Sequence, residues 1–335
     1  MSIAPPEFLP ILFGYGSFVR KKDGSVQFDG NGNPIYLIPS TDDFLEMKPS
    51  KESRQYWPVH VTQNMPVTTS VVLLSIVVNT HCEKADMVTE IGYTIFDTAT
   101  IYDGAKGSRK KKISGCVAPG PRGENITKLA LSQHFIVEDT ADHHPGTCNS
   151  PAHTAQPYHF SYRKSGFISR EKVSKTLEEA FNKATNQGLT HASIEEGNRR
   201  AVILVGWGDA NLHSQIKATS WYKNKQLFQQ WDIRRHPLVL ERLPNPTFLT
   251  CLDTFGIQHR AYDKEIGHNA GNHSAFSMHL LIGLCFLTQE QRAHLKSGLN
   301  LEPNSKFPGV ESVLARDNRP PGSAPLPPGR VPILH

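Results

Sequence analysis

The segment VVLLSIVV, residues 71–78, constrains the fold more than any other part of the sequence. It is a continuous apolar run without alternation, which is typical of a strand buried on both faces of a sheet. Such a strand needs helices above and below it, so it predicts a layered α/β domain. The chain has 335 residues, of which 38% are hydrophobic and 20% charged, and this composition allows a core of that kind.

Other segments extend this pattern into an ordered set of elements. After the run at 71–78 we expect strands at 87–98, 129–137, 201–205 and 248–252, and helices beginning at Ser169 and covering 211–221 and 274–287. The order is three strands and a helix, followed by alternating strands and helices. It predicts a mixed β-sheet, antiparallel first and parallel after the crossovers, with helices on both faces.

Three regions are expected along the chain. Residues 1–70 are predicted to be an N-terminal extension with β-hairpins, because short alternating runs flank Asp-Gly and Asn-Gly turns. Residues 71–300 are predicted to form the α/β domain. Residues 301–335 are rich in proline and have little to bury, so we expect a disordered tail.

Charge and cysteine usage limit the location and partners of the protein. The 36 Lys and Arg against 31 Asp and Glu give a net charge of +5, which permits nucleic acid as a partner without requiring it. The five cysteines are scattered, and no C-x-x-C pair suggests a disulfide scaffold or a structural zinc site. We therefore expect a reducing compartment, the cytoplasm or the nucleus. No apolar run approaches the roughly 20 residues that span a bilayer, so no membrane association is expected.

Four motifs resemble one enzyme superfamily when they are taken in order. They are VVLLSIVVNT, TEIGYTIFDT, AVILVGWGDANL and GHNAGNHSAFSMHLLIGL, and they lie between Val71 and Leu287. Together they resemble the DEDDh 3′–5′ exonucleases, which have an RNase H-like fold. With Asp253-Thr254 included, the chain is most similar to the fungal exonuclease-like branch that contains mRNA-export-linked proteins.

The resemblance also implies a site and shows where the chain departs from it. In the superfamily, four carboxylates hold two Mg²⁺ or Mn²⁺ ions and a histidine activates water. The matching carboxylate positions here are Val77, Asn79, Leu212 and His273, while the histidine is kept as His268. Asp209 lies three residues before Leu212. The implied charge at these positions falls from −4 to 0, so no metal cofactor and no Mg²⁺-dependent nuclease activity are expected.

Three functions remain open. The first is a catalytically degenerate protein that binds single-stranded nucleic acid or a protein partner. The second is an active nuclease that uses Mg²⁺ or Mn²⁺ with substitute ligands, namely Asp209, His268, His273 and Asn79. The third is a cleft containing His268, His273 and Trp207 that has been adapted to a small molecule. A further alternative is a zinc site formed by His81, Asn79 and His273.

Several residues have a structural interpretation beside the functional one. Trp207 is expected to fill the volume of the lost metal site, and His273 to lie directly before the last helix. Glu90 and Asp97 are expected to be structural, and Asp253 to cap a turn after its strand. The basic groups are either solvated or in contact with phosphate. They are Arg109 to Lys112 (Arg109, Lys110, Lys111 and Lys112), Arg199 with Arg200, and Arg234 with Arg235 and His236.

Overall fold

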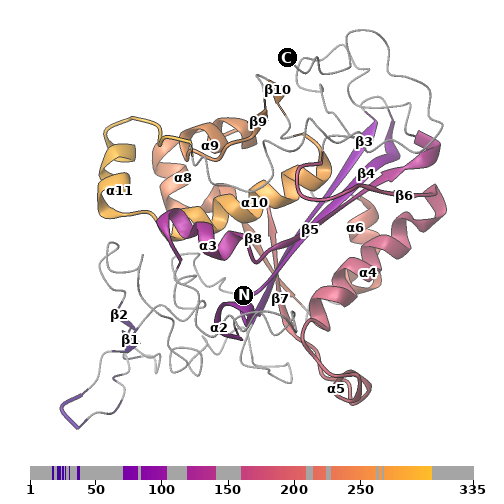
Figure 1. The fold of residues 1–335 in the computed structure, drawn as a ribbon, viewed down its shortest axis with the longest axis horizontal. Coiled ribbons are helices and arrows are strands. Elements are labelled where there is room, and N and C mark those ends of the chain that lie inside the picture. The colour runs from indigo at the N-terminus through magenta and orange to yellow at the C-terminus, as the bar shows by residue number, and fades with distance from the viewer. Residues whose placement is uncertain are drawn as a thin grey trace.

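A computed structural model gives the fold around a six-stranded sheet (Figure 1). It describes residues 17–18, 21–23, 25, 27, 30, 36–37, 71–81, 84–103, 119–140, 160–208, 214–223, 228–261, 264–265 and 268–303. The sheet order is β6-β5-β4-β3-β7-β8. The strands are β3 (Val71–His81), β4 (Lys84–Asp97), β5 (Leu131–Val137), β6 (Gly166–Ile168), β7 (Ala201–Gly206) and β8 (Phe228–Asp232).

The directions of the strands confirm the predicted mixed sheet. β4 is antiparallel to both β3 and β5, whereas β6, β7 and β8 each lie parallel to their inner neighbour. β3 is central, since it pairs with β4 at Val72–Asp97 and with β7 at Val71–Ala201. Residues 71–76 are buried, as the apolar run predicts.

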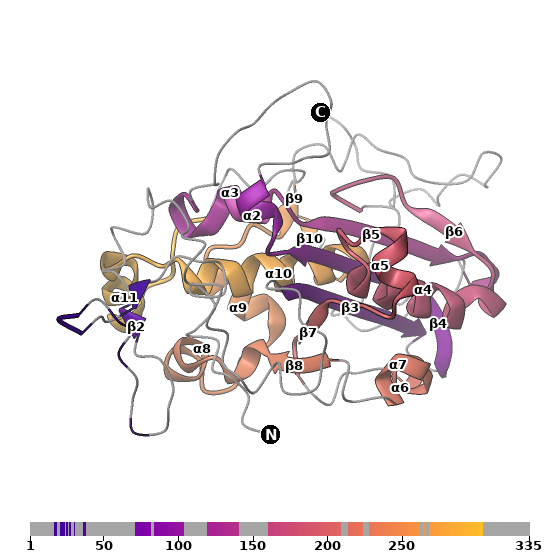
Figure 2. The ribbon, with the colours of Figure 1, turned by 90° about the horizontal axis from the view of Figure 1, so that it is seen from below.

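Helices cover both faces of the sheet (Figures 1 and 2). On one face, alternate β3 residues such as Val71 and Leu73 pack in a cluster with residues of several helices. On the other face, Val72, Leu74 and Ile76 pack in a second cluster. The first set of helices is α3 (Glu124–Thr127), α8 (Pro237–Arg242), α9 (Phe248–Thr254), α10 (Ala270–Cys285) and α11 (Gln289–Lys296). The second set is α4 (Val173–Thr185), α6 (Ser214–Ala218) and α7 (Ser220–Lys223).

The strand predicted at 248–252 is wrong, because this segment is the helix α9. Thr247 and Thr250 form a reciprocal capping box at its start. Phe248, Cys251 and Leu252 are buried together, as residues at positions i, i+3 and i+4 of a helix are. The last strand of the sheet is instead β8, which the sequence pattern did not predict.

The other boundaries shift by smaller amounts. Ser169 precedes a short 3-10 turn, Arg170–Lys172, and α4 starts at Val173. The helix predicted at 211–221 is divided into α6 and α7 around Thr219 within the described residues. The helix predicted at 274–287 is α10, which starts at Ala270, four residues earlier than predicted. The short elements are α2 (Thr100–Asp103), α5 (His191–Glu195), β9 (Arg260–Ala261) and β10 (Lys264–Glu265).

Helix α10 lies unusually close to the sheet at Gly92. A Cβ atom added there would lie 2.1 Å from the backbone carbonyl carbon of Ala270 and 2.3 Å from the backbone nitrogen of Gly271. Only a residue without a side chain allows this approach. Gly92 therefore sets how closely the start of α10 approaches β4.

Parts of the outer segments are also described. β1 (Ser17–Phe18) and β2 (Tyr36–Leu37) pair antiparallel, which agrees with a β extension before the domain. At the predicted turn, Asp23 accepts hydrogen bonds from the backbone and the hydroxyl of Ser25. The predicted tail beyond residue 303 lies outside the described residues. Among the described helices, none combines the length and apolarity that crossing a membrane requires.

Candidate functional site

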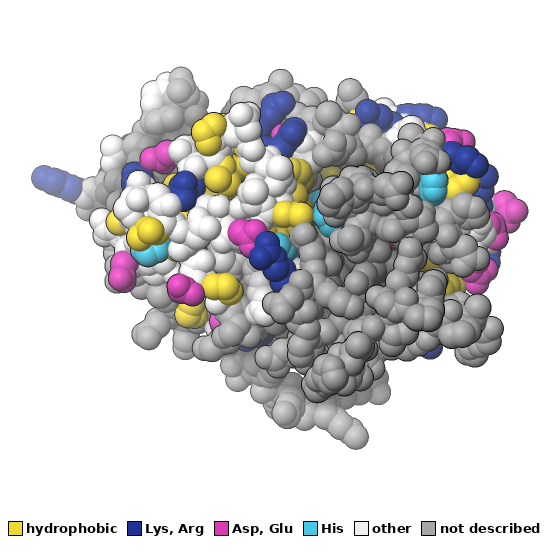
Figure 3. Space-filling model, turned by 90° about the horizontal axis from the view of Figure 1, so that it is seen from above, with side chains coloured by type: hydrophobic (Ala, Val, Ile, Leu, Met, Phe, Trp, Pro, Cys, Tyr) yellow, Lys and Arg dark blue, Asp and Glu magenta, His cyan; other side chains and the backbone are white. Residues whose placement is uncertain are grey.

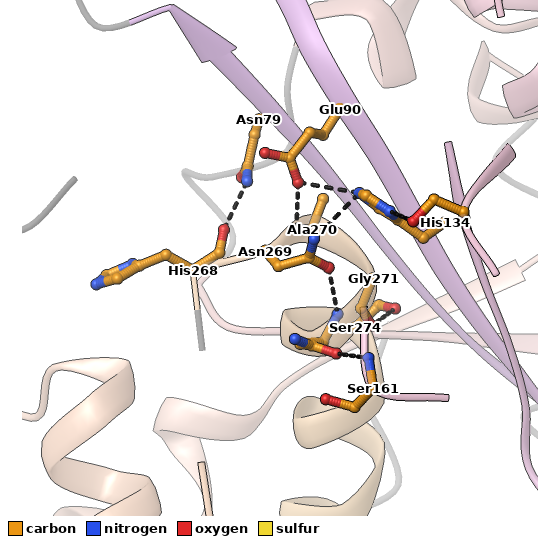
Figure 4. A network of polar contacts seen from close by, with 11 residues as sticks. Asn79, Glu90, His134, Ser161, His268, Asn269, Ala270, Gly271 and Ser274 are labelled. Carbon is orange, nitrogen blue, oxygen red and sulfur yellow. Dashed lines mark hydrogen bonds and ion pairs between the residues drawn. The ribbon is translucent and has the colours of Figure 1, made fainter. Parts of the chain in front are cut away.

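The candidate site lies where the end of β3 meets the start of α10. Alternation along β3 places Val77 and Asn79 on the face that α10 covers, in line with Val71 and Leu73. Asn79 confirms this placement, because its Nδ2 donates to the backbone carbonyl of His268 over 2.7 Å. Figure 4 shows this contact, with the His268 imidazole directed away from the rest of the network. β3 and the residues before α10 are thus joined by an amide at one of the predicted carboxylate positions.

A buried carboxylate holds the first turn of α10 on the neighbouring side. Glu90 on β4 is 0% exposed, and its Oε2 accepts the backbone N–H of Ala270 over 3.0 Å. The Nε2 of His134 lies within hydrogen-bond distance of the same oxygen, at 3.0 Å, and Nδ1 of His134 lies 2.9 Å from the Ser165 hydroxyl. A carboxylate at a helix N-terminus also interacts favourably with the helix dipole. Glu90 therefore fixes α10 in place, which agrees with its predicted structural role.

Asn269 completes the start of α10. Its side-chain oxygen accepts the backbone N–H of Asn272 over 3.0 Å, so Asn269 is the N-cap of the helix. The side-chain oxygen of Asn272 in turn accepts the backbone N–H of Ser161 over 2.9 Å, which ties the segment before β6 to the same turn. Within the GHNAGN motif, Asn269 thus caps α10 and Asn272 ties it to a neighbouring segment.

His273 lies inside the first turn of α10, and not before the helix as predicted. Its ring stacks on Phe248, the first residue of α9, with centroids 3.9 Å apart and ring planes 14° apart. Burial, and secondarily the neighbouring His268, lowers the pKa of His273 to about 3. The imidazole is therefore neutral at physiological pH and engaged in an aromatic contact.

Trp207, which follows β7, extends this aromatic group. Its ring meets Phe248 edge-on at 5.5 Å, and the residue is only 9% exposed. Trp207, Phe248 and His273 therefore form one packed stack between the ends of β7, α9 and α10. We refer to these three residues as the aromatic stack. Phe248 was not predicted to take part, because the sequence pattern placed it on a strand.

These residues do not fit a pair of hard divalent cations. Magnesium and manganese need anionic or carbonyl oxygen ligands, and Val77 offers none. Asn79 is bonded to a backbone carbonyl, and His273 is stacked on Phe248. Within the described part of the chain, no three His, Cys, Asp or Glu side chains come together as a metal site would require. The zinc alternative with His81, Asn79 and His273 gains no support from these contacts.

Some predicted site residues cannot be placed. Asp209, Leu212 and the basic loop Arg109 to Lys112 lie outside the described residues. His268 is half-buried at the edge of the network, with its carbonyl held by Asn79. Their predicted roles remain predictions.

The pair Arg199 and Arg200 does not form a phosphate-binding patch. Arg200 is 4% exposed, and its guanidinium donates to Asp97 over 2.5 Å. Arg199 donates to the backbone carbonyls of Ile194 and Asn198. Both arginines therefore stabilise the loop before β7, and Asp97 has the structural role that was predicted for it.

Two acidic residues differ from expectation. Asp253 lies within α9, where it accepts hydrogen bonds from His259 over 3.0 Å and Arg260 over 3.2 Å, so it caps no turn after a strand. Asp232 at the end of β8 was not predicted to matter. Its buried side chain accepts the backbone N–H groups of Gly208 and Arg234. An aspartate that follows a strand and precedes a 3-10 turn is a recognisable capping signal, but it is visible only once β8 is known to be a strand.

The comparison with known families agrees with this fold. Residues 72–284 match the family described as DNA polymerase III subunit epsilon-like, C-terminal domain, DEDDh_C. The matched region exceeds half of the chain and covers the six-stranded sheet and α10 except for the end residues Val71 and Cys285. No curated protein gives a match. The mixed sheet with helices on both faces is the RNase H-like arrangement that the motifs predict. The chain belongs to the DEDDh_C family of the DEDDh exonuclease superfamily.

Proposed function

We propose that this protein is a catalytically degenerate member of the family and that its role is to bind single-stranded nucleic acid or a protein partner. One observation carries the proposal. The described positions that correspond to the family carboxylates hold Val77, Asn79 and His273, and the two polar ones make structural contacts. A phosphodiester hydrolase of this type has no evident way to hold its metal ions there.

Electrostatics supports the same conclusion. Two unit charges 4 Å apart interact by about 4 kcal/mol at an effective dielectric constant of 20, and a divalent ion doubles this for each carboxylate. Replacing the carboxylates with Val77, Asn79, Leu212 and His273 removes most of that attraction. His268 remains, but the general base of the family acts on a water whose pKa is lowered by a bound metal ion.

The proposal also includes the branch of the superfamily and the cellular compartment of the protein. The GHNAGN motif and the order of the segments favour the fungal exonuclease-like branch that contains mRNA-export-linked proteins. An intracellular protein of this group, in the cytoplasm or the nucleus, would meet nucleic acid as a ligand. The net charge of +5 is modest, so binding would depend on a local site. On the face shown in Figure 3, the described Lys and Arg side chains are interspersed with Asp and Glu.

A nuclease assay tests the loss of activity. Labelled single-stranded and duplex substrates are incubated with Mg²⁺ or Mn²⁺, and we expect no progressive shortening from the 3′ end. Shortening that disappears in His268→Ala would overturn the proposal and favour the nuclease with substitute ligands. This assay is combined with a binding measurement, because a lack of hydrolysis does not by itself show that the protein binds nucleic acid.

Metal addition gives an independent test that does not depend on activity. A ligand that binds only the folded state raises its stability by RT ln(1 + [L]/Kd). Because the site lacks the carboxylates, we expect millimolar Mg²⁺ to leave the thermal midpoint of the protein unchanged relative to an EDTA control. A clear rise in the midpoint would show a metal site and contradict the proposal.

Fluorescence anisotropy with a labelled single-stranded RNA tests the binding role. The basic loop is expected to contribute, so a triple Lys110→Ala, Lys111→Ala, Lys112→Ala variant should lower the salt slope of binding by roughly 1 to 2 units. If the wild-type protein fails to bind RNA at low salt, the protein-partner form of the proposal remains and the nucleic-acid form is lost.

A further inference from the structure

A second feature of the same sheet edge has no role so far. β3, β7 and β8 are parallel, so their carboxyl ends lie at one edge of the sheet. In open α/β sheets, ligands bind outside this edge. The carboxyl end of β3 carries Asn79, that of β7 is followed by Trp207 and Gly208, and that of β8 ends at Asp232 and is followed by Arg234.

Arg234 is held firmly by Asp232. Its Nη2 donates to Oδ2 of Asp232 over 3.1 Å, and its Nε lies 3.3 and 3.4 Å from the two carboxylate oxygens. The Asp232 side chain is 2% exposed, whereas that of Arg234 is 38% exposed. Asp232 thus holds the guanidinium in one orientation, while part of the Arg234 side chain stays accessible to solvent. Within the described part of the chain, Nη1 of Arg234 donates no hydrogen bond.

Gly208 makes room for this guanidinium. A Cβ atom at Gly208 would lie 2.6 Å from the central carbon of the Arg234 guanidinium, and the residue has φ +87°. The N–H of Gly208 donates to Asp232 over 2.7 Å. A single buried carboxylate therefore fixes both the backbone after β7 and the arginine that lies over it.

Arg234 lies close to the emptied metal site. Gly208 directly follows Trp207, and the aromatic stack leads from Trp207 through Phe248 to His273. Adjacent strands are about 4.8 Å apart, so β8 lies about 10 Å from β3 across the sheet. A single strand of nucleic acid that passes over Asn79 and His268 would reach Arg234 within a few nucleotides.

We infer that Arg234, oriented by Asp232, binds a backbone phosphate of single-stranded nucleic acid at this edge without a metal ion. The inference rests on the proposed function and names a group that performs it. An oriented guanidinium matches the geometry of phosphate oxygens. Arg235, 67% exposed and 3.7 Å from the same carboxylate, leaves the group of two arginines and one aspartate with a positive charge.

The lost carboxylates make this arrangement favourable. A site with four carboxylates attracts phosphate only through its metal ions, because the carboxylates alone repel it. With Val77, Asn79 and His273 at three of those positions, the repulsion is removed at the described part of the edge. A fixed arginine can then take over the attraction that the metal ions supply in the family.

Anisotropy measurements in EDTA test this inference with single-stranded RNA as the probe. Arg234→Gln should raise Kd about tenfold, and it should lower the slope of log K against log salt by about 0.7, the value for one phosphate contact. The matched control is Arg170→Gln. Arg170 is 58% exposed, lies 4.0 Å from the exposed carboxylate of Asp86, and follows β6 at the opposite edge of the sheet. This control should bind like the wild type.

The outcomes separate the inference from the proposed function. Wild-type binding that is unchanged in Arg234→Gln, or equally weakened in Arg170→Gln, overturns the inference and leaves nucleic-acid binding in place. Absence of wild-type binding in EDTA overturns the inference together with the nucleic-acid form of the proposed function, and leaves its protein-partner form. Circular dichroism checks that the variant is folded. If it is not, Arg234→Lys replaces it; this variant keeps the charge, so a retained slope with a weaker Kd supports the inference and an unchanged Kd overturns it.

Discussion

The first turn of α10 faces two regions of the sheet that differ in kind. On one side, Glu90 is a buried carboxylate bound to His134 and to the start of the helix. On the other side, β3 presents Val77 and Asn79, two of the positions that the resemblance aligns with family carboxylates. Both sides are packed against the helix, but only the side of Glu90 carries a buried carboxylate.

The difference shows which acid the fold itself requires. Glu90 accepts the N–H of Ala270 at the helix start, and removing it leaves buried donors without an acceptor. Carboxylates gathered at one site repel one another when no ion is present, so under the proposed function, which needs no metal, replacing them stabilises the fold. Asn79 and His273 then become free to support the packing. Three predictions test this contrast, in order of decreasing expected effect.

Glu90→Ala should have the largest effect. The substitution leaves two buried groups, the Ala270 N–H and the His134 ring, without their partner, at about 1–3 kcal/mol each in the free energy of unfolding. Urea unfolding monitored by circular dichroism measures this loss. Glu179→Ala, on the exposed surface of α4, is the control and should change the stability by no more than about 0.5 kcal/mol. A loss below that of Asn79→Ala would mean that the two sides of α10 do not differ as described.

The second prediction concerns acid. Burial lowers the pKa of His273 to about 3 in the folded state, against about 6.5 in the unfolded chain. The unfolded state therefore binds more protons below pH 6.5, and stability falls as the pH drops from about 6.5 towards 3, by about 1.4 kcal/mol per pH unit for this residue. His273→Phe keeps a ring against Phe248 and cannot titrate. As the pH drops from about 6.5 towards 3, the stability of this variant should fall less steeply than that of the wild type. The difference between the two slopes corresponds to the uptake of one proton on unfolding.

Two other histidines bear on that comparison. His236 and His279 also have pKa values lowered by burial, to about 4 and about 3. Both remain in His273→Phe, so some acid sensitivity should persist in the variant. Chemical unfolding at a series of pH values gives the slopes. Equal slopes in the two proteins would show that His273 is not held neutral by its surroundings.

Asn79→Ala should have the smallest effect. It removes the single hydrogen bond to the His268 carbonyl, and a bond of this kind contributes about 1 kcal/mol. Urea unfolding is again the measurement, with Asn198→Ala on the loop before β7 as a comparison for a half-buried amide. A loss as large as that of Glu90→Ala would show that α10 is anchored mainly through Asn79 on β3.

The sheet was predictable from the sequence where burial acts on both faces of a strand. The run at 71–78 is apolar except for Ser75 and the segment 201–205 is apolar throughout, so both are expected to be buried on both faces of the sheet. β8, with the sequence FQQWD, lies at the edge of the sheet and lacks such a run. The FLTCL segment at 248–252 is short and apolar, and such segments fit a strand or a helix equally well. The capping box at Thr247 decides for the helix.

The candidate site was predictable only in its positions. The motifs placed Val77, Asn79 and His273 near one another, and the structure joins Asn79 to His268 within the GHNAGN motif. The partners could not be predicted, because they come from distant segments. His134 reaches Glu90 across 44 positions of the sequence, and Phe248 covers His273 from another helix. No local pattern encodes such contacts.

The close approach at Gly92 has a consequence for genetic suppression. The atoms that would meet a side chain at position 92 are backbone atoms of Ala270 and Gly271, which every residue at those two positions shares. A second substitution at either position therefore cannot relieve a Gly92→Ala or Gly92→Ser defect by trimming a side chain. Suppressors of such an allele would have to move α10 as a whole, for instance by altering how Glu90 or Asn269 holds its first turn.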